Sequence, residues 1–490
     1  MYGEIKQLLK HGSIYTVGIV LSRIVAFVMI PVYTNCLTPA EYGVLELLGL
    51  TADLISTSVG MGMAAAVMRF YFKHEDPERR NAVISTSLLG VIAVMGLTVS
   101  LCIVFSKEFS RLVFSSEEYT TPFRVMFLSM FFSSAIEIPL IFLRAKQKSV
   151  TFVVISLVKM VIQLGLNIFF LVYLKMGVIG VLYSTLISAV IISLYLIAVT
   201  WRETGIRFDK ASYKDMLRFG APLIMADLSI FGLTYADHYM LNYFGSLTVV
   251  GLYSLAYKFG MLVSLLFATP FRSIWTARMF EIAKQENGRQ IYAKVLTYFL
   301  LGSLTISLGI SCFSRDALRV MAEESYWSAY HIVPLIAVSY VAVGVIAIAG
   351  AGLMIMHRTK YIALSTTCAL VVNIVLCILL IPIWGAMGAA IVTLVSYFVR
   401  LGIDAYNSQK LFRIDYEWRR IIPGLAAYVV LTLLAVYVEI DSLVISLLVN
   451  GAIVAAYPVS LLVLGVFTQE EKTYVKDFFN RRLKSFPGRS

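Results

Sequence analysis

Charged residues are scarce in this sequence. Asp, Glu, Lys and Arg make up 14% of the 490 residues, whereas 59% are hydrophobic and the mean hydropathy is +0.83. Soluble globular proteins carry about 25% charged residues, so a composition this apolar excludes a soluble globular protein. We predict a polytopic membrane protein.

Cysteine and catalytic motifs are also scarce. Five cysteines lie within or at the ends of apolar segments, and none has the CxxC spacing of a zinc or redox site. They are Cys36, Cys102, Cys312, Cys368 and Cys377. The chain contains no GxxxxGK[ST], HExxH or GxSxG motif. We therefore expect no enzyme, no cofactor, no metal site and an energy source other than direct ATP hydrolysis.

Long hydrophobic runs fill most of the chain instead. A membrane-spanning helix needs about 20 predominantly apolar residues, and about 14 segments qualify. They are 12–36, 42–68, 82–105, 122–143, 150–174, 177–200, 219–244, 247–271, 292–313, 328–356, 361–382, 385–408, 421–438 and 442–467. Runs this long predict helices rather than barrel strands, because a helix satisfies its own backbone hydrogen bonds in lipid. The expected fold class is an all-α polytopic membrane protein.

The basic residues predict the orientation of these spans. If both termini are cytoplasmic, most of the 41 Lys and Arg residues fall in cytoplasmic segments, as the positive-inside rule requires. The outer loops then hold only Lys107, Arg111, Lys175, Arg315 and Arg319. The net charge of +12 reflects this orientation and attraction to anionic membrane lipids, so no nucleic-acid partner is expected. The first span lacks a cleavage site, and we expect it to be retained.

The chain repeats itself at an offset of 208 residues. KQLLKHG (6–12) aligns with KDMLRFG (214–220), YGVLELL (42–48) with VGLYSLA (250–256), and GVIGVLYSTLIS (177–188) with GAMGAAIVTLVS (385–396). Spans 1 to 6 and 7 to 12 are therefore predicted to be two parallel copies of one six-helix unit. The predicted domains are an N-lobe (1–205), a C-lobe (206–410), two further helices (411–468) and a cytoplasmic tail (469–490). Two like lobes suit transport by alternating access.

Three stretches carry a resemblance to a known family. IPVYTNCLTPAEYGVLELL (30–48), YADHYMLNYFG with VVGLYSLAYKFG (235–245, 249–260) and VNIVLCILLIPIWGAMGAAIVTLVSY (372–397) resemble the polysaccharide-transport family of O-antigen and oligosaccharide flippases. That family belongs to the multidrug/oligosaccharidyl-lipid/polysaccharide flippase superfamily. The resemblance implies a V-shaped, two-lobed fold. It also implies translocation of undecaprenyl-diphosphate-linked oligosaccharides across the bacterial inner membrane, for lipopolysaccharide O-antigen, capsule or exopolysaccharide.

Four cations inside or near spans are candidate ligands for the diphosphate of such a substrate. They are Arg23, Lys159 and Lys258, deep in spans, and Arg124, nearer the outer face. Arg suits phosphate through forked hydrogen bonds and Lys through a compact charge. Arg23 and Lys258 are preferred because their helices resemble those that supply cavity cations in the lipid II flippase. The alternative is that these cations form buried ion pairs, with Glu46 or Asp53 as partners.

Three carboxylates inside spans are candidates for coupling an ion to transport. They are Asp53, Asp227 and Asp237, and a membrane carboxylate that exchanges a proton or sodium ion is what an antiporter needs. The family motif usually has arginine after the aspartate that stands here as Asp237, whereas this chain has His238, whose charge depends on pH. A hydrogen bond that packs helices is the alternative role of His238.

Functions other than that of a flippase are compatible with part of these sequence features. A multidrug antiporter of the same superfamily would export cations from a cleft lined with carboxylates, which the intramembrane cations argue against. A membrane enzyme or a passive scaffold of polysaccharide assembly would also be an apolar, many-helix chain. Expected partners are the lipid-linked oligosaccharide, membrane lipids, and polysaccharide polymerase and chain-length proteins. The sugar repeat, the final polymer, the coupling ion and the oligomeric state stay open.

Overall fold

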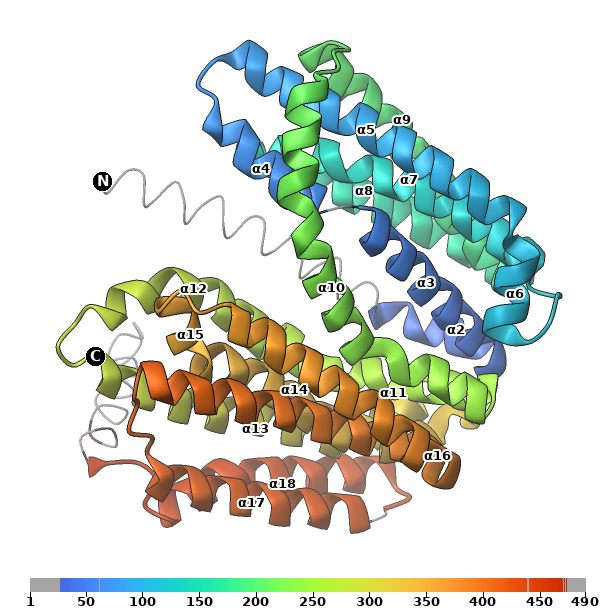
Figure 1. Ribbon diagram of the computed structural model, residues 1–490. Coiled ribbons are helices and arrows are strands. Elements are labelled where there is room, and N and C mark those ends of the chain that lie inside the picture. The colour runs from blue at the N-terminus through green and yellow to red at the C-terminus, as the bar shows by residue number, and fades with distance from the viewer. Residues whose placement is uncertain (1–26, 61, 439, 470, 472, 474–490) are drawn as a thin grey trace, which may run out of the picture. The chain divides into compact units, whose positions relative to one another are not determined.

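The structure is helical throughout its described part. The computed structural model describes residues 27–60, 62–438, 440–469, 471 and 473, and contains no strand among them (Figure 1). The α-helices are α2 Ile30–Cys36, α3 Pro39–Val59, α4 Met63–Lys73, α5 Pro77–Val104, α6 Ser106–Phe114, α7 Thr120–Ala145, α8 Ser149–Ile168, α9 Gly177–Thr204, α10 Lys210–Phe244, α11 Leu247–Val263, α12 Thr269–Ala283, α13 Gly288–Met321, α14 Val333–Ala349, α15 Ala351–Ile355, α16 Lys360–Leu411, α17 Trp418–Tyr437 and α18 Leu443–Val463. Two π-helical segments, η1 Phe169–Tyr173 and η2 Ser264–Ala268, and one 3-10 segment, η3 Glu324–His331, complete them.

The helices confirm the predicted fold class. Twelve helices of the described residues are long and apolar enough to cross a membrane. One of them, α16, has 52 residues and contains two predicted spans, which meet at a kink where Gly385 has a non-helical backbone conformation. The twelve helices therefore account for every predicted span except 12–36, most of which lies outside the described residues. The protein is a multi-pass, all-helical membrane protein.

The internal repeat is visible in the helix boundaries. Helix α3 begins at Pro39 and α11 at Leu247, which are 208 residues apart. Gly177 and Gly385 are separated by the same offset, and both have left-handed backbone conformations, with φ of 58° and 53°. Glycine enters that region without steric cost. The repeat therefore extends from sequence similarity to the positions at which helices start and turn.

Local sequence signals explain where individual helices begin. Helix α3 opens with a capping box, in which the Thr38 side chain accepts from the Glu41 N–H and the Glu41 carboxylate accepts from the Thr38 N–H. Pro39 follows at the first helical position, where its missing N–H costs nothing. At α5 the Asp76 side chain caps the helix by accepting from the Glu78 N–H, with Pro77 next. These caps satisfy backbone donors that would otherwise be unpaired at the helix ends.

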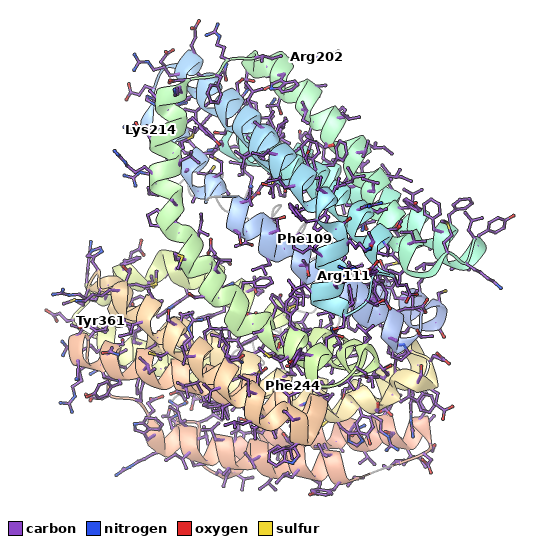
Figure 2. The ribbon with its side chains drawn as sticks, turned by 45° about the vertical axis from the view of Figure 1, so that its right-hand side comes forward. Phe109, Arg111, Arg202, Lys214, Phe244 and Tyr361 are labelled. Atoms are coloured by element: carbon purple, nitrogen blue, oxygen red, sulfur yellow. The ribbon has the colours of Figure 1, made fainter. Side chains whose placement is uncertain are left out.

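The chain divides into two compact units. Unit 1 comprises residues 1–255, 321–328 and 366–393, and unit 2 comprises 256–320, 329–365 and 394–490. The predicted domain boundaries at 205, 410 and 468 stay predictions. Within unit 1, Arg202 and Lys214 lie at one end, and Arg111, on α6, lies toward the other (Figure 2).

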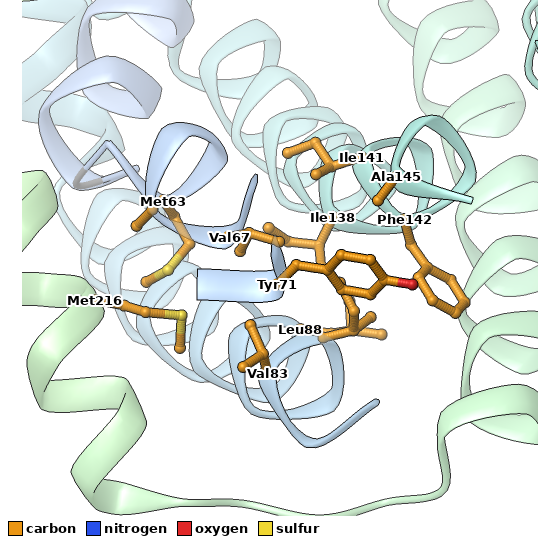
Figure 3. Close-up of a cluster of buried hydrophobic side chains, with 12 residues drawn as sticks. Met63, Val67, Tyr71, Val83, Leu88, Ile138, Ile141, Phe142, Ala145 and Met216 are labelled. Atoms are coloured by element: carbon orange, nitrogen blue, oxygen red, sulfur yellow. The ribbon is translucent and has the colours of Figure 1, made fainter. Parts of the chain in front are cut away.

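Helices α4, α5, α7 and α10 share one core in unit 1. Figure 3 shows the apolar side chains that meet there. They include Val67 and Tyr71 of α4, Leu88 of α5, Phe142 of α7 and Met216 of α10, none of which is more than 6% exposed. The segment before α10 is fastened to α5 as well, since Ser85 and Thr86 hydroxyls accept from backbone N–H groups of residues 207 and 209, each at 2.9 Å.

Two glycines let α3 and α11 cross closely within unit 1. A Cβ atom on Gly43 would overlap the carbonyl oxygen of Leu247, and one on Gly251 would overlap the carbonyl oxygen of Pro39. Gly43 and Gly251 are 208 residues apart, as are Pro39 and Leu247, so the crossing is formed by equivalent positions of the repeat. Backbone-to-backbone contact of this kind needs residues without side chains.

In unit 2, the helices α17 and α18 form a hairpin that is attached to α13 by polar contacts. The hydroxyls of Ser307 on α13 and Tyr428 on α17 are 2.9 Å apart. Further along α13, Asp316 accepts hydrogen bonds from Ser446 of α18. Figure 1 shows α17 and α18 lying side by side. Hydrogen bonds between side chains of neighbouring helices, shielded from water, fix the position of one helix along the other.

Candidate functional site

A buried carboxylate joins three helices of unit 1. Asp237 on α10 is 0% exposed, and its Oδ2 accepts hydrogen bonds from the hydroxyls of Tyr253 on α11 at 2.6 Å and Thr393 on α16 at 2.8 Å. Its Oδ1 lies 2.8 Å from the backbone nitrogen of His238 and 2.7 Å from His238 Nδ1. We call Asp237, His238, Tyr253 and Thr393 the Asp237 network.

The chemistry of the Asp237 network follows from its donors. Four groups point hydrogen-bonding nitrogen or hydroxyl atoms at one carboxylate, and an ionised carboxylate accepts only. Burying such a group is tolerated when its lone pairs are satisfied by hydrogen bonds. His238 is itself 1% exposed and lies edge-on to the Tyr253 ring, with centroids 5.0 Å apart. The network therefore both fixes α10, α11 and α16 to one another and places a titratable imidazole against a carboxylate.

The other two candidate carboxylates have different surroundings. Asp53 on α3 and Asp227 on α10 are both exposed. A charged side chain within a span faces a protein interior or a water-filled space rather than lipid, so these two are suited to line a wet surface of unit 1. Although Asp227 and Asp237 share a helix, one is exposed and the other is buried. The structure does not bring them into one site.

Lys159 is the candidate cation with the plainest environment. It is half-buried in α8 and makes no ion pair or hydrogen bond with the residues that the structure describes. For Lys159, the predicted alternative of an ion pair with Glu46 or Asp53 is therefore not formed in this structure. An amine at this position within an apolar helix needs either an anion or water.

A polar stripe on α8 continues on both sides of Lys159. Ser156, Gln163 and Asn167 follow the three- and four-residue spacing of one helix face. The Gln163 amide donates to Thr185 of α9 at 3.1 Å. The Asn167 amide donates to the Tyr33 hydroxyl of α2 at 2.8 Å, and its oxygen accepts from Ser184 of α9. We call these residues together with Lys159 the α8 stripe.

The remaining predicted cations are spread over the molecule. Lys258 on α11 is half-buried and belongs to unit 2. Arg124 is exposed near the start of α7, where its Nε donates to the Ser106 hydroxyl at 3.0 Å, so it is tied to α6. Arg23 lies outside the described residues. Among the described residues, no three His, Cys, Asp or Glu side chains are grouped as metal ligands would be.

An ion-pair cluster orders the segment between α6 and α7. The carboxylate of Glu117 lies 2.7 Å from Lys107 Nζ and 2.8 Å from Arg111 Nε. Hydrogen bonds from Lys107 and then Arg111 lower the pKa of Glu117 below its ordinary value. Figure 2 shows Arg111 together with Phe109 on α6. The cluster uses both predicted outer-loop cations of this segment.

Sequence reasoning identified Asp237, His238 and Lys159 but missed Thr393 and the other residues of the α8 stripe. Thr393 lies in GAMGAAIVTLVS, and its counterpart in the repeat is Thr185, which accepts from Gln163. Both threonines thus contact a polar side chain of a neighbouring helix. The sequence features that could have identified the missed residues are the threonine repeated at the offset of 208 residues and the spacing of Ser156, Lys159, Gln163 and Asn167.

Comparison with known structures identifies the fold. The chain matches a lipid II flippase, MurJ, in an inward closed conformation, with a TM-score of 0.73 and 15% identity, over 91% of this chain and 97% of that one. It also matches an inward-facing multidrug resistance MATE family transporter of the MOP superfamily, with a TM-score of 0.63 and 16% identity, over 79% of this chain and 95% of that one. At these identities the likeness shows the fold, which is that of multi-helix membrane transporters and flippases.

The sequence itself places the protein in a family. Residues 8–282 match the family described as polysaccharide biosynthesis protein, which is more than half of the chain. The protein belongs to this family, and the predicted resemblance is confirmed. A search of curated proteins finds no significant match.

Proposed function

We propose that this protein moves undecaprenyl-diphosphate-linked oligosaccharides across the bacterial inner membrane during synthesis of a surface polysaccharide. The observation that carries the proposal is the match of residues 8–282 to the polysaccharide biosynthesis family. The fold shared with a lipid II flippase supports transport rather than catalysis. A polyprenyl-linked sugar has an anionic diphosphate and many hydroxyl groups, so its carrier needs cations and hydrogen-bonding groups at membrane depth.

The α8 stripe supplies groups of both kinds. Lys159 offers a positive charge that no described residue neutralises, and the half-buried Gln163 adds a polar group on the same helix face. Asn167, beyond it, is buried and bonded to Tyr33 and Ser184. Lysine binds phosphate as a compact point charge. We assign Lys159 a role in holding the diphosphate, together with Arg23, Lys258 and Arg124.

The carboxylates are assigned to coupling. Asp53 and Asp227 are exposed within spans, whereas Asp237 is held by four donors, including His238. In this proposal, exchange of an ion at one of these carboxylates drives the return of the transporter to its inward state. The protein is oriented with both termini in the cytoplasm and delivers its product to polymerase and chain-length proteins.

The test is translocation of a fluorescent undecaprenyl-diphosphate oligosaccharide in proteoliposomes. Lys159→Gln removes the charge but keeps a polar side chain of similar length. We expect translocation by this variant to fall at least about tenfold, because a charge-assisted hydrogen bond in a protein is worth about 1.5–3 kcal/mol. Lys210→Gln removes an exposed lysine at the start of α10 and should leave the rate unchanged.

Two outcomes would contradict the proposal. If the wild-type protein moves no lipid-linked sugar but exports cationic dyes, the protein is a multidrug antiporter. If translocation occurs but Lys159→Gln and Lys210→Gln are equally active, the flippase function stands and the role of Lys159 is wrong. Arg23→Gln and Asp227→Asn, assayed in the same way, test the roles assigned to Arg23 and Asp227.

A further inference from the structure

Two reciprocal hydrogen bonds join the two copies of the repeat at one end of unit 1. The Thr34 hydroxyl, in α2 of the first copy, donates to Ile30 of its own helix and lies 3.2 Å from the Met321 carbonyl oxygen of the second copy. Asn242, in α10 of the second copy, donates from Nδ2 to the Val113 carbonyl oxygen of the first copy at 2.5 Å. Thr34 and Asn242 are 208 residues apart, and so are Val113 and Met321. Equivalent positions of the repeat therefore make the same contact in both directions, and we call these two contacts the reciprocal pair.

Both acceptors of the reciprocal pair are carbonyl oxygens at the C-terminal ends of helices. Val113 lies in the last turn of α6, and Met321 is the last residue of α13. The last four carbonyl groups of a helix have no partner within it, so each needs a side chain or water. A hydrogen bond between two protein groups is exchanged for hydrogen bonds to water at a small net cost. Contacts of this kind therefore suit a joint that opens and closes.

An aromatic side chain reinforces the contact at Met321. Tyr326, in η3, is 0% exposed, and its hydroxyl donates to the Leu37 carbonyl oxygen at 2.9 Å. Its ring packs edge-on against Tyr42 of α3, with centroids 6.0 Å apart. Residues 321–328 follow α13 in the chain, but they cluster with unit 1. This short segment of the second copy is therefore attached to α2 and α3 of the first copy.

The charge distribution predicts that these contacts lie on the outer side of the membrane. Helices α2 and α10 end spans that are predicted to start in the cytoplasm, and Val113 and Met321 lie in predicted outer segments. The crossing of α3 and α11 joins the same two copies at the same end. Asp53, in the exposed polar surface of α3, lies 14 residues beyond Pro39, which is about 21 Å along a helix. Contacts at the outer end are therefore placed to separate this surface from the outside.

We propose that the reciprocal pair, together with Tyr326, forms a gate that closes the outer side of the transporter and opens when the substrate is released. Thr34 and Asn242 are its positioning residues, because each holds a helix end of the other copy. Asn167 of the α8 stripe donates to the Tyr33 hydroxyl, beside Thr34, at 2.8 Å, which connects the gate to the stripe assigned to the substrate. The inference rests on the proposed function for what passes the gate, whereas opening itself is observable without substrate.

The first experiment measures access from outside in intact spheroplasts. Gly49→Cys is the reporter, because Gly49 is exposed, shares a helix face with Asp53, and a Cβ there would have no heavy atom within 4 Å. Its labelling by a membrane-impermeant maleimide is followed alone and combined with Thr34→Val or Asn242→Leu, which remove a donor and are similar in size. We expect each substitution to speed labelling about fivefold, because losing a hydrogen bond shifts the balance between closed and open states by its net strength.

Two control variants make similar changes away from the gate. Thr297, on α13, is 0% exposed like Thr34, and it donates to Ala293 of its own helix at 3.0 Å. Tyr243, next to Asn242, is 79% exposed. Thr297→Val and Tyr243→Phe should leave the labelling rate unchanged. The thermal unfolding midpoint checks that each variant is folded, and protein without the reporter gives the background from native cysteines.

The second experiment locks one contact of the reciprocal pair. Val113→Cys and Asn242→Cys are introduced together and joined by a short, reducible bis-thiosulfonate in proteoliposomes. We expect the cross-link to stop translocation of the fluorescent lipid-linked oligosaccharide and reduction to restore it, which a purely structural contact would not show. The control joins Lys146→Cys to Glu203→Cys, at an ion pair within the first copy, and should leave translocation unchanged.

Equal labelling rates in Thr34→Val, Asn242→Leu and the two controls would overturn the proposal, because the reciprocal pair would then not govern access. Translocation that continues after Val113→Cys and Asn242→Cys are cross-linked would overturn it as well. If the wild-type protein moves no lipid-linked sugar, the proposed function fails, and the labelling rates alone decide whether the gate exists.

Discussion

At the scale of single residues, Asp237 is the side chain whose chemistry is most constrained. Asp237→Asn preserves the shape but replaces an acceptor oxygen with an NH2 donor that faces the Tyr253 and Thr393 hydroxyls. We expect the free energy of unfolding to fall by about 2 kcal/mol, the cost of leaving buried donors unsatisfied. Denaturant unfolding in detergent would measure this change.

Asp227→Asn is the matched control, because it makes the same substitution on the same helix at an exposed position. Its effect should stay within about 0.5 kcal/mol. Equal stability of the two variants would show that the Asp237 network does not hold the helices. A loss of transport in Asp237→Asn protein that is fully stable would point to ion coupling instead.

Glu117 predicts a local pH dependence. Its pKa in the folded protein is lowered by Lys107 and Arg111. The ionised Glu117 therefore stabilises the segment between α6 and α7 fully above the ordinary glutamate pKa of about 4.3. This stabilisation is lost as the pH falls through the lower pKa of the folded protein. Glu117→Gln mimics the protonated state at neutral pH. We expect faster backbone hydrogen exchange over residues 106–119 in this variant.

The neighbouring Glu118→Gln is the control for Glu117→Gln. Glu118 is exposed, and its carboxylate makes no ion pair with the described residues, so exchange over the same segment should match wild type at neutral pH. If both variants exchange equally fast, charge in general rather than the Lys107 and Arg111 contacts orders this segment.

The candidate site could be predicted only in part from single residues. Asp237 and His238 were recognisable because charged residues inside apolar spans are rare and therefore conspicuous. Thr393 and Gln163 were missed because a threonine or glutamine in a span is common, and only its neighbours in space give it a role. Which carboxylates are buried and which are exposed also depends on helix rotation, as the contrast between Asp237 and Asp227 shows.

At the scale of helices, the crossing of α3 and α11 makes a strong prediction about glycine. Gly43→Ala and Gly251→Ala each place a methyl group against a backbone carbonyl of the other helix, which cannot rotate away. We expect each to lower the thermal unfolding midpoint and to reduce the free energy of unfolding by about 1–3 kcal/mol, the cost of overpacking.

Gly49→Ala provides the control on the same helix, because a Cβ at Gly49 would have no heavy atom within 4 Å. Alanine there should be neutral or stabilising by up to about 1 kcal/mol, since it is the better helix former. Equal effects of Gly43→Ala and Gly49→Ala would mean that the helices are not in backbone contact at Gly43.

The existence of the helices was predictable, but their irregularities were not. Apolar length determines a span, because lipid leaves a backbone no other way to satisfy its hydrogen bonds. The π-helical segments Phe169–Tyr173 and Ser264–Ala268 carry no comparable signal in their residues. The short helix α6 was expected as part of a loop, because its nine residues are too few and too polar for a span.

At the scale of the whole molecule, the repeat predicted more than any single segment did. Two copies with six spans each require both copies to have the same orientation, and the equivalent glycines at 177 and 385 show that the backbone follows the repeat. The α17–α18 hairpin has no counterpart in it. Its attachment through Asp316 and Ser307 could not be read from the sequence, because a serine or tyrosine on an apolar helix does not identify its partner.

The orientation of the chain is the prediction that joins these scales. Because few basic residues lie in the predicted outer loops, reversing the protein would require many more cations to cross the membrane, which the positive-inside rule disfavours. Glu118→Cys, between α6 and α7, should therefore react with a membrane-impermeant maleimide in intact spheroplasts. Glu286→Cys, between α12 and α13, should react only after permeabilisation. Both positions are exposed. The parent protein, treated with the same maleimide, should stay unlabelled, which would show that its own five cysteines do not contribute. Labelling of Glu286→Cys alone in intact spheroplasts would reverse the orientation, whereas the helical fold would stand unchanged.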